Sequence, residues 1–256
     1  MSGTVGIVEV PPLIPGQDER GSRRTTPAAR RFGNHSLLEW VVRRVTDSLL
    51  LDQVVVLTDW QQGELISRLA PPDVRVLVGA SPDPLTRFAA AVRTCAADRA
   101  VRVPVASPFL DPTLIDRLVC TSVAQPTADY IGYVASRGGP AVLARLGLFA
   151  EWCRAEAIFR ADREAVCPEE RNPATRYLYS HPELFRLRLI PVPPQLDRDD
   201  LRLTVKVEED WEHAHIIFEA LGREALDWQR IAELLDHQPA LRRRMAVLNQ
   251  AEQCAP

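Results

Sequence analysis

An arginine-rich segment, residues 11–35, combines residue types that bind phosphate. Its arginines and glycines are Arg20, Arg23, Arg24, Arg30, Arg31, Gly16, Gly21 and Gly33. A guanidinium can hold two phosphate oxygens at once, and glycine lets the backbone come close to an anion. The segment has no Walker pattern and no G-x-G-x-x-G. Spacing alone therefore favours a solvated basic loop over a phosphate-binding loop.

Lys206 is the only lysine in the chain, although lysine and arginine together number 31. It directly follows an apolar run at 201–205, and Glu208 and Glu209 come soon after it. A lysine in this place supplies either a positive charge at a ligand site or one half of an ion pair with Glu208 or Glu209.

Other polar residues lie at the predicted ends of strands and helices, and each has two interpretations. Thr58 and Asp59 close a strand, where a turn and a nucleotide contact are both natural. Arg87 either contacts a nucleotide or pairs with Asp83, four residues before it. Arg102 lies within an apolar run and is expected to form a structural ion pair more readily than a ligand contact.

Composition excludes several classes of protein. The 256 residues are 46% hydrophobic and 25% charged, with a formal net charge of -3, which is ordinary for a folded domain and unlike a nucleic-acid binder. No apolar run has the roughly 20 residues of a membrane span, and no basic leader precedes the first strand. The five cysteines include no C-x-x-C pair, and G-x-S-x-G is absent. We expect a cytoplasmic protein that binds neither nucleic acid nor membrane.

The first half of the chain alternates apolar runs with amphipathic stretches. The predicted strands are 4–10, 53–58, 74–78, 100–105 and 130–134, and the predicted helices are 36–48, 62–69, 84–97 and 112–122. Ser36 and Asp111 are expected to cap two of these helices. Continuous Val, Ile and Leu strands between helices predict a parallel sheet that is covered on both faces. Ligands of such sheets bind beyond the carboxyl ends of the strands.

The second half is less regular. Its predicted strands are 141–144, 184–192 and 201–207, and its predicted helices are 147–159, 172–179, 209–221 and 228–249, with a break at 238–239. We therefore expect one α/β domain over 1–225 and a helical C-terminal extension over 226–256. The extension is expected to fold back onto the domain, and a homodimer through this helix is the alternative.

Five stretches carry a resemblance to a known family. They are 36–40 (SLLEW) with 51–59 (LDQVVVLTD), 79–88 (GASPDPLTRF), 101–112 (VRVPVASPFLDP), 170–185 (ERNPATRYLYSHPELF) and 201–205 (LRLTV) with 209–212 (EDWE). In order and spacing they resemble the nucleotidyltransferases that activate sugars. The likeness is greatest to cytidylyltransferases of the spore-coat polysaccharide biosynthesis protein F type, which are related to CMP-KDO synthetase.

The resemblance implies a fold, a reaction and a set of ligands. The fold is a three-layer sandwich with a mostly parallel mixed sheet, of the nucleotide-diphospho-sugar transferase (GT-A-like) kind. The reaction joins a sugar oxygen to the α-phosphorus of a nucleoside triphosphate, typically CTP, and releases pyrophosphate. In such a reaction Mg²⁺, held by two aspartates, bridges the phosphates. The ligands are the triphosphate and an acidic sugar of surface-polysaccharide synthesis.

The sequence departs from the family pattern at both metal ligands. Ala106, followed by Ser107, takes the place of the first aspartate, and Lys206 takes the place of the second. The loop keeps Gly21-Ser22-Arg23-Arg24, but Thr26-Pro27 replaces the expected Gly-Lys. Two hypotheses follow: a nucleotidyltransferase in which Lys206 supplies the charge of the metal, and a non-catalytic relative that binds a nucleotide, a sugar phosphate or a partner protein.

Both hypotheses predict the same site. Lys206 is the candidate catalytic residue, no residue is assigned to a metal, and Mg²⁺ is expected only if the protein is active. The predicted nucleotide-binding residues are Arg23, Arg24, Thr58, Asp59, Arg87, Arg102, Ala106 and Ser107.

Overall fold

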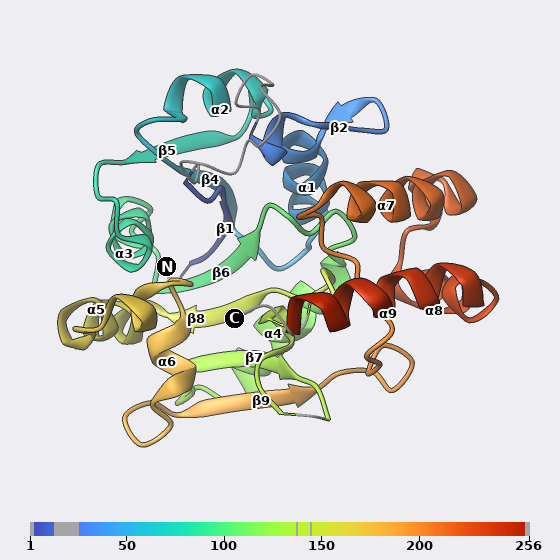
Figure 1. The fold of residues 1–256 in the computed structure, drawn as a ribbon. Helices are drawn as coiled ribbons and strands as arrows, with labels where there is room; N and C mark the ends of the chain where they lie inside the picture. The colour runs from blue at the N-terminus through green and yellow to red at the C-terminus, as the bar shows by residue number, and fades with distance from the viewer. Residues whose placement is uncertain (1–2, 13–25, 137, 144, 254–256) are drawn as a thin grey trace.

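A seven-stranded mixed sheet organises the protein, as the computed structural model shows (Figure 1). The structure describes residues 3–12, 26–136, 138–143 and 145–253. The strands of this sheet are β1 (Thr4–Glu9), β4 (Gln53–Asp59), β5 (Arg75–Gly79), β6 (Arg99–Pro104), β7 (Tyr130–Val134), β8 (Glu151–Arg154) and β9 (Leu187–Pro191). They lie in the order β5-β4-β1-β6-β8-β7-β9. A two-stranded hairpin, β2 (Arg31–Phe32) and β3 (His35–Ser36), stands apart from it.

All neighbouring strands of the sheet run parallel except those beside β8. The pairs β1–β4, β1–β6, β4–β5 and β7–β9 are parallel, whereas β8 is antiparallel to both β6 and β7. In the β1–β6 pair, Glu9 lies opposite Pro104, so these two strands end side by side. The predicted mostly parallel mixed sheet is confirmed.

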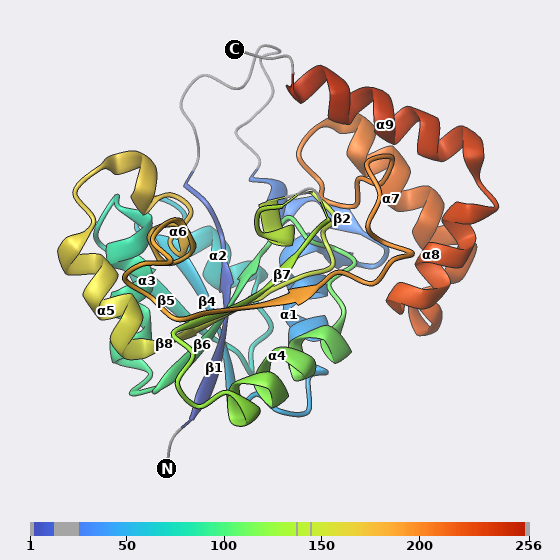
Figure 2. The same cartoon turned by 90° about the horizontal axis from the view of Figure 1, so that it is seen from below.

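Helices cover both faces of the sheet, which gives three layers (Figure 2). They are α1 (Leu37–Thr46), α2 (Gly63–Leu69), α3 (Pro84–Thr94), α4 (Pro112–Ala124), α5 (Ala155–Glu164), α6 (Arg176–Ser180), α7 (Glu208–Leu221), α8 (Trp228–Asp236) and α9 (Pro239–Gln253). One buried core lies under α3, α5 and α6. A second core joins the other face of the sheet to α1, α4 and the C-terminal helices. None of the described helices is long and apolar enough to cross a membrane.

Side-chain caps set where several helices begin. The Ser36 hydroxyl accepts a hydrogen bond from the Glu39 amide (3.1 Å), and Asp83 accepts one from the Thr86 amide (2.7 Å). Asp111 caps α4 through the Thr113 amide (2.8 Å), as its place before Pro112 predicts. The second oxygen of Asp111 accepts a hydrogen bond from the Trp228 amide (2.8 Å), which ties the start of α8 to the start of α4.

The helical C-terminal segment packs onto the domain. Its apolar residues Ile231, Leu235, Leu241 and Met245 are buried in the same core as α1 and α4. Its break falls between α8 and α9, at Pro239, as predicted. The expectation that this segment folds back onto the domain is therefore confirmed.

Three predictions in the second half are wrong. The strand predicted over 141–144 is not formed by its described residues, because Ala141–Leu143 forms a 3-10 helix. The helix predicted over 147–159 begins only at Ala155, since residues 151–154 form β8 between β6 and β7. The strand predicted at 201–207 has no ladder. The amides of Leu203 and Thr204 bond to the carbonyl of Arg145, and the amide of Val205 bonds to the carbonyl of Ala106.

Candidate functional site

A cavity of about 470 Å³ opens where β1 and β6 end, at the rim where parallel sheets bind ligands. The described residues that line it are Glu9, Pro11, Pro12, Pro82, Pro84, Arg87, Arg102, Pro104, Val105, Ala106, Asn172 and Lys206. They come from both halves of the chain, and three of them carry a positive charge. We call this cavity the rim pocket.

Ala106 and Lys206 are brought together in the rim pocket although 100 residues separate them. The Val205 amide donates a hydrogen bond to the Ala106 carbonyl (2.9 Å). One carboxylate oxygen of Asp210 accepts hydrogen bonds from the amides of Lys206 (2.9 Å) and Val207 (3.1 Å). Asp210 is itself held by the buried Arg202 (2.5 Å). These bonds fix the backbone at Lys206 beside Ala106.

The amine of Lys206 has no acidic partner among the described residues. Glu208, one of its expected partners, binds Arg30 through two hydrogen bonds (2.6 and 2.8 Å). Loss of contact with water lowers the pKa of Lys206, and the positive charges of Arg145 and Arg202 lower it further, with partial compensation by Asp210. Both arginines are paired with acids, Arg145 with Glu252 and Arg202 with Asp210 and Glu252, whereas the amine of Lys206 is not. A bound anion would stabilise its charge.

Arg102 forms the structural ion pair that its place in an apolar run predicts. Its guanidinium binds Glu9 (2.6 Å) and Glu151 (2.8 Å), and all three side chains are buried. Glu151 also accepts hydrogen bonds from the hydroxyls of Tyr130 (2.7 Å) and Thr175 (2.9 Å). Burial alone would lower the pKa of Arg102, but the charges of Glu9 and Glu151 outweigh it and raise that pKa. The carboxylates of Glu9 and Glu151 thus more than compensate the charge of Arg102 at the floor of the pocket and leave one negative charge in excess.

Arg87 has no acidic partner among the described residues. Its side chain is only 2% exposed, and its Nη1 donates to the backbone carbonyls of Ser81 (3.1 Å) and Pro82 (2.7 Å). Its Nε and Nη2 are buried and make no hydrogen bond within the described residues. Asp83, the partner that the spacing suggests, instead binds Arg171 (2.7 and 3.0 Å). A buried guanidinium with free donors in a cavity wall is a site for an anion.

Gly79 makes the room for Arg87. A Cβ at this position would lie 2.7 Å from both Cγ and Cδ of Arg87, closer than such atoms ever approach. The glycine ends β5, one residue before the loop that leads into α3. The missing side chain therefore lets the stem of Arg87 cross the strand end and present its guanidinium to the pocket.

The remaining predicted residues lie elsewhere. Asp59 closes a turn by accepting hydrogen bonds from the Gln62 amide (3.0 Å) and side chain (3.3 Å). Thr58 and Ser107 are buried, and neither is among the residues of the rim pocket. Arg23 and Arg24 lie outside the described residues. Of the nine predicted side chains, the rim pocket brings together Arg87, Arg102, Ala106 and Lys206.

Sequence reasoning missed Glu9 and Asn172, which also line the pocket. A signal for Glu9 was present, since it is the one charged residue in the otherwise apolar strand 4–10. Asn172 has no such signal, because only the fold carries its loop to the end of β6.

The residues of the pocket do not fit a divalent cation. Magnesium takes hard oxygen ligands, and Glu9 is the only acidic side chain among the described lining residues. That carboxylate already binds Arg102, and the amine of Lys206 repels a cation. No cluster of three or more His, Cys, Asp or Glu that could hold a metal occurs in the described part of the chain.

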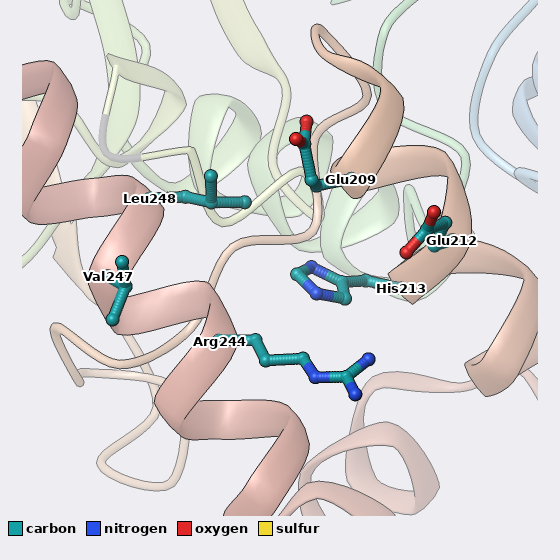
Figure 3. A pocket seen from close by; sticks show the side chains of 6 residues that line it. All are labelled: Glu209, Glu212, His213, Arg244, Val247 and Leu248. Atoms are coloured by element: carbon teal, nitrogen blue, oxygen red, sulfur yellow. The ribbon is translucent and has the colours of Figure 1, made fainter.

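A second hollow of about 430 Å³ lies between α7 and α9 (Figure 3). Glu209, Glu212, His213 and Arg244 line it, so opposite charges face one another there. Burial lowers the pKa of His213, which favours its neutral form. No strand ends at this hollow, and its mixed charges do not select an ion of either sign. The rim pocket is the better candidate.

Both the sequence and the fold are similar to those of known cytidylyltransferases. The sequence profile of the family described as cytidylyltransferase matches residues 28–250. The spore coat polysaccharide biosynthesis protein SpsF of Bacillus subtilis (strain 168) is 25% identical over 218 residues, which cover 82% of this chain and 87% of that protein.

Solved structures share the fold at low identity. A cytidylyltransferase from Leptospira borgpetersenii superposes with a TM-score of 0.74 at 20% identity, covering 94% of this chain and 95% of that one. CMP:2-keto-3-deoxy-manno-octonic acid synthetase in complex with CTP has a TM-score of 0.60 at 11% identity, covering 86% and 98%. A Mycobacterium tuberculosis H37Rv protein in complex with manganese has a TM-score of 0.57 at 13% identity, covering 84% and 99%.

Proposed function

Because the chain belongs to the cytidylyltransferase family, we propose that its rim pocket binds a cytidine nucleotide, CTP, together with an acidic sugar. The observation that carries this proposal is Arg87, a buried guanidinium with two free donor nitrogens in the wall of the pocket. Lys206 adds a second unpaired cation across from Ala106. The bound CTP of one structural neighbour and the polysaccharide role in the name of SpsF support the ligand class.

Thermal unfolding with different nucleotides tests this function. A ligand that binds only the folded protein adds about 2.7 kcal/mol of stability at 100 times its dissociation constant. We expect CTP to raise the unfolding temperature more than UTP, GTP or ATP, and CMP to raise it less because it carries fewer phosphate charges. Absence of a shift with every nucleotide would contradict the proposal.

Transfer of the cytidylyl group is the second candidate function, and the position of Lys206 favours it. In this reaction a sugar hydroxyl oxygen attacks the α-phosphorus, a new P–O bond forms, and pyrophosphate leaves. The ammonium of Lys206 would stabilise the charge that develops on the phosphate oxygens. Release of pyrophosphate from CTP with a panel of acidic sugars measures this activity directly. Binding without pyrophosphate release would identify a non-catalytic relative.

A further inference from the structure

Three cations line the rim pocket, and their surroundings divide them into two kinds. Arg102 is neutralised by Glu9 and Glu151 and therefore has no charge to offer a ligand. Arg87 and Lys206 have no acidic partner in the described residues. Arg87 and Lys206 outnumber the one carboxylate charge that the Arg102 triad leaves in excess, so the cavity keeps a net positive charge that an anion can relieve.

The free donors of Arg87 have a geometry suited to phosphate. Nη1 is committed to two backbone carbonyls and thereby holds the plane of the guanidinium in place. Nε and Nη2 lie on another edge of the same plane and are free together. Two parallel N–H donors on one edge can bind two oxygens of one phosphate.

Lys206, which precedes α7 in the second half of the chain, contributes the other unpaired cation among the described residues of the rim pocket. Its backbone is fixed by Asp210, whereas Arg145 and Arg202 behind it are themselves paired with Glu252 and Asp210. A divalent cation would be repelled here, whereas the phosphate oxygens of a nucleotide would be attracted. The pocket therefore offers the phosphates charge and hydrogen bonds of its own.

We propose that the rim pocket binds the triphosphate of its nucleotide as the metal-free anion, with the guanidinium of Arg87 and the amine of Lys206 in place of a divalent cation. This inference rests on the proposed function, because it concerns the phosphates of the same nucleotide. Magnesium then competes with the protein, since chelation neutralises part of the charge that Arg87 and Lys206 recognise.

Titration of CTP into the full-length protein by calorimetry tests the inference, once with EDTA and once with excess magnesium chloride at matched ionic strength. We expect binding in EDTA and weaker binding with magnesium. Tighter binding with magnesium, or binding that requires it, would overturn the inference and leave the proposed function standing. Absence of binding in both buffers would instead overturn the proposed function, and the inference with it.

Variants assign the effect to the two cations. Loss of a hydrogen-bonded charge is expected to weaken CTP binding in EDTA by about 10- to 100-fold for Arg87→Met. Lys206→Met should weaken it less, and because the side chain is only partly desolvated this substitution is not expected to unfold the protein. Arg188→Met removes an exposed arginine from β9, at the far edge of the sheet, and serves as the matched control. Equal binding by all three variants would overturn the inference.

A double substitution reverses the sign of the magnesium effect. Ala106→Asp with Lys206→Asp places two carboxylates at neighbouring positions, because the backbones of 106 and 205 are hydrogen-bonded. We expect this variant to bind CTP more tightly with magnesium than with EDTA. An unchanged preference for EDTA would show that these two positions do not contact the phosphates and would overturn the inference.

Discussion

Arg87 and Arg102 line the same pocket and are both buried, yet the regions around them differ in one respect. Arg102 lies in the middle of the sheet, where Glu9 from β1 and Glu151 from β8 neutralise it. Arg87 lies on the first turns of α3, where it meets only backbone carbonyls. A buried charge with its partners in place supports the structure, whereas one without partners indicates a missing ligand. Within this cavity, Arg102 therefore has a structural role, and Arg87 is the residue that we expect to bind a ligand.

The largest loss of stability is expected from Arg102→Met, which removes the cation of the buried ion pairs with Glu9 and Glu151. Arg102→Met leaves Glu9 and Glu151 buried without a cation, and a broken buried ion pair costs about 3–5 kcal/mol. Urea unfolding should show this loss as a lower midpoint with an unchanged slope. Arg188→Met is again the control, and a loss below about 1 kcal/mol would contradict the role given to the triad.

A smaller effect is expected from filling the space behind Arg87. In Gly79→Ala the added methyl meets the stem of Arg87, and overpacking of this kind costs about 1–3 kcal/mol. The displaced guanidinium should also weaken CTP binding by about tenfold. Calorimetry and urea unfolding measure the two losses, and wild-type affinity in this variant would show that Arg87 does not contact the ligand.

Removal of the unpaired charge should hardly change stability. Arg87→Met gives up hydrogen bonds to two carbonyls but also removes an uncompensated buried charge, and we expect the two to cancel to within about 1 kcal/mol. Its unfolding midpoint should therefore lie close to that of the wild type. A loss as large as that of Arg102→Met would remove the distinction between the two regions.

The smallest expected effect is a dependence of CTP affinity on pH. The pKa of Lys206 is lowered in the free protein by burial, Arg145 and Arg202, with Asp210 opposing, and a bound polyphosphate would raise it again. Ligand binding then takes up protons between the pKa of the free protein and that of the complex, and CTP affinity falls by about threefold to tenfold as the pH rises through this interval. Lys206→Arg keeps its charge over this range, so its affinity should stay level. If CTP affinity depended on pH in the same way in the wild type and in Lys206→Arg, another titrating group would be responsible.

Much of the first half of the fold was predictable because its signals are local. Helical spacing of apolar residues and the caps Ser36 and Asp111 identified α1 and α4, and short Val-rich runs identified β1, β4 and β6. The errors fell where tertiary contacts outweigh local pattern. Residues 151–154 read as part of a helix but are extended because β6 and β7 bind them on both sides.

The extended segment before Lys206 shows the same limit. Its apolar residues Leu201, Leu203 and Val205 alternate with polar ones, which is the pattern of a strand, and residues 201–205 are all buried. The structure places it against Gly147, where a Cβ would lie 2.5 Å from the Leu203 carbonyl. This close approach of two backbones gives isolated hydrogen bonds instead of a ladder, and the sequence pattern cannot distinguish the two.

The sequence by itself determined the family, the layered α/β fold and the identity of the unusual residues Ala106 and Lys206, because residue types and spacing are local properties of the chain. Only the tertiary structure decided which charges are neutralised. The partners of Arg102 come from strands 93 and 49 residues away, and the expected partner of Arg87 is taken by Arg171. Charge compensation depends on distances through space, which sequence spacing does not encode beyond a turn of helix.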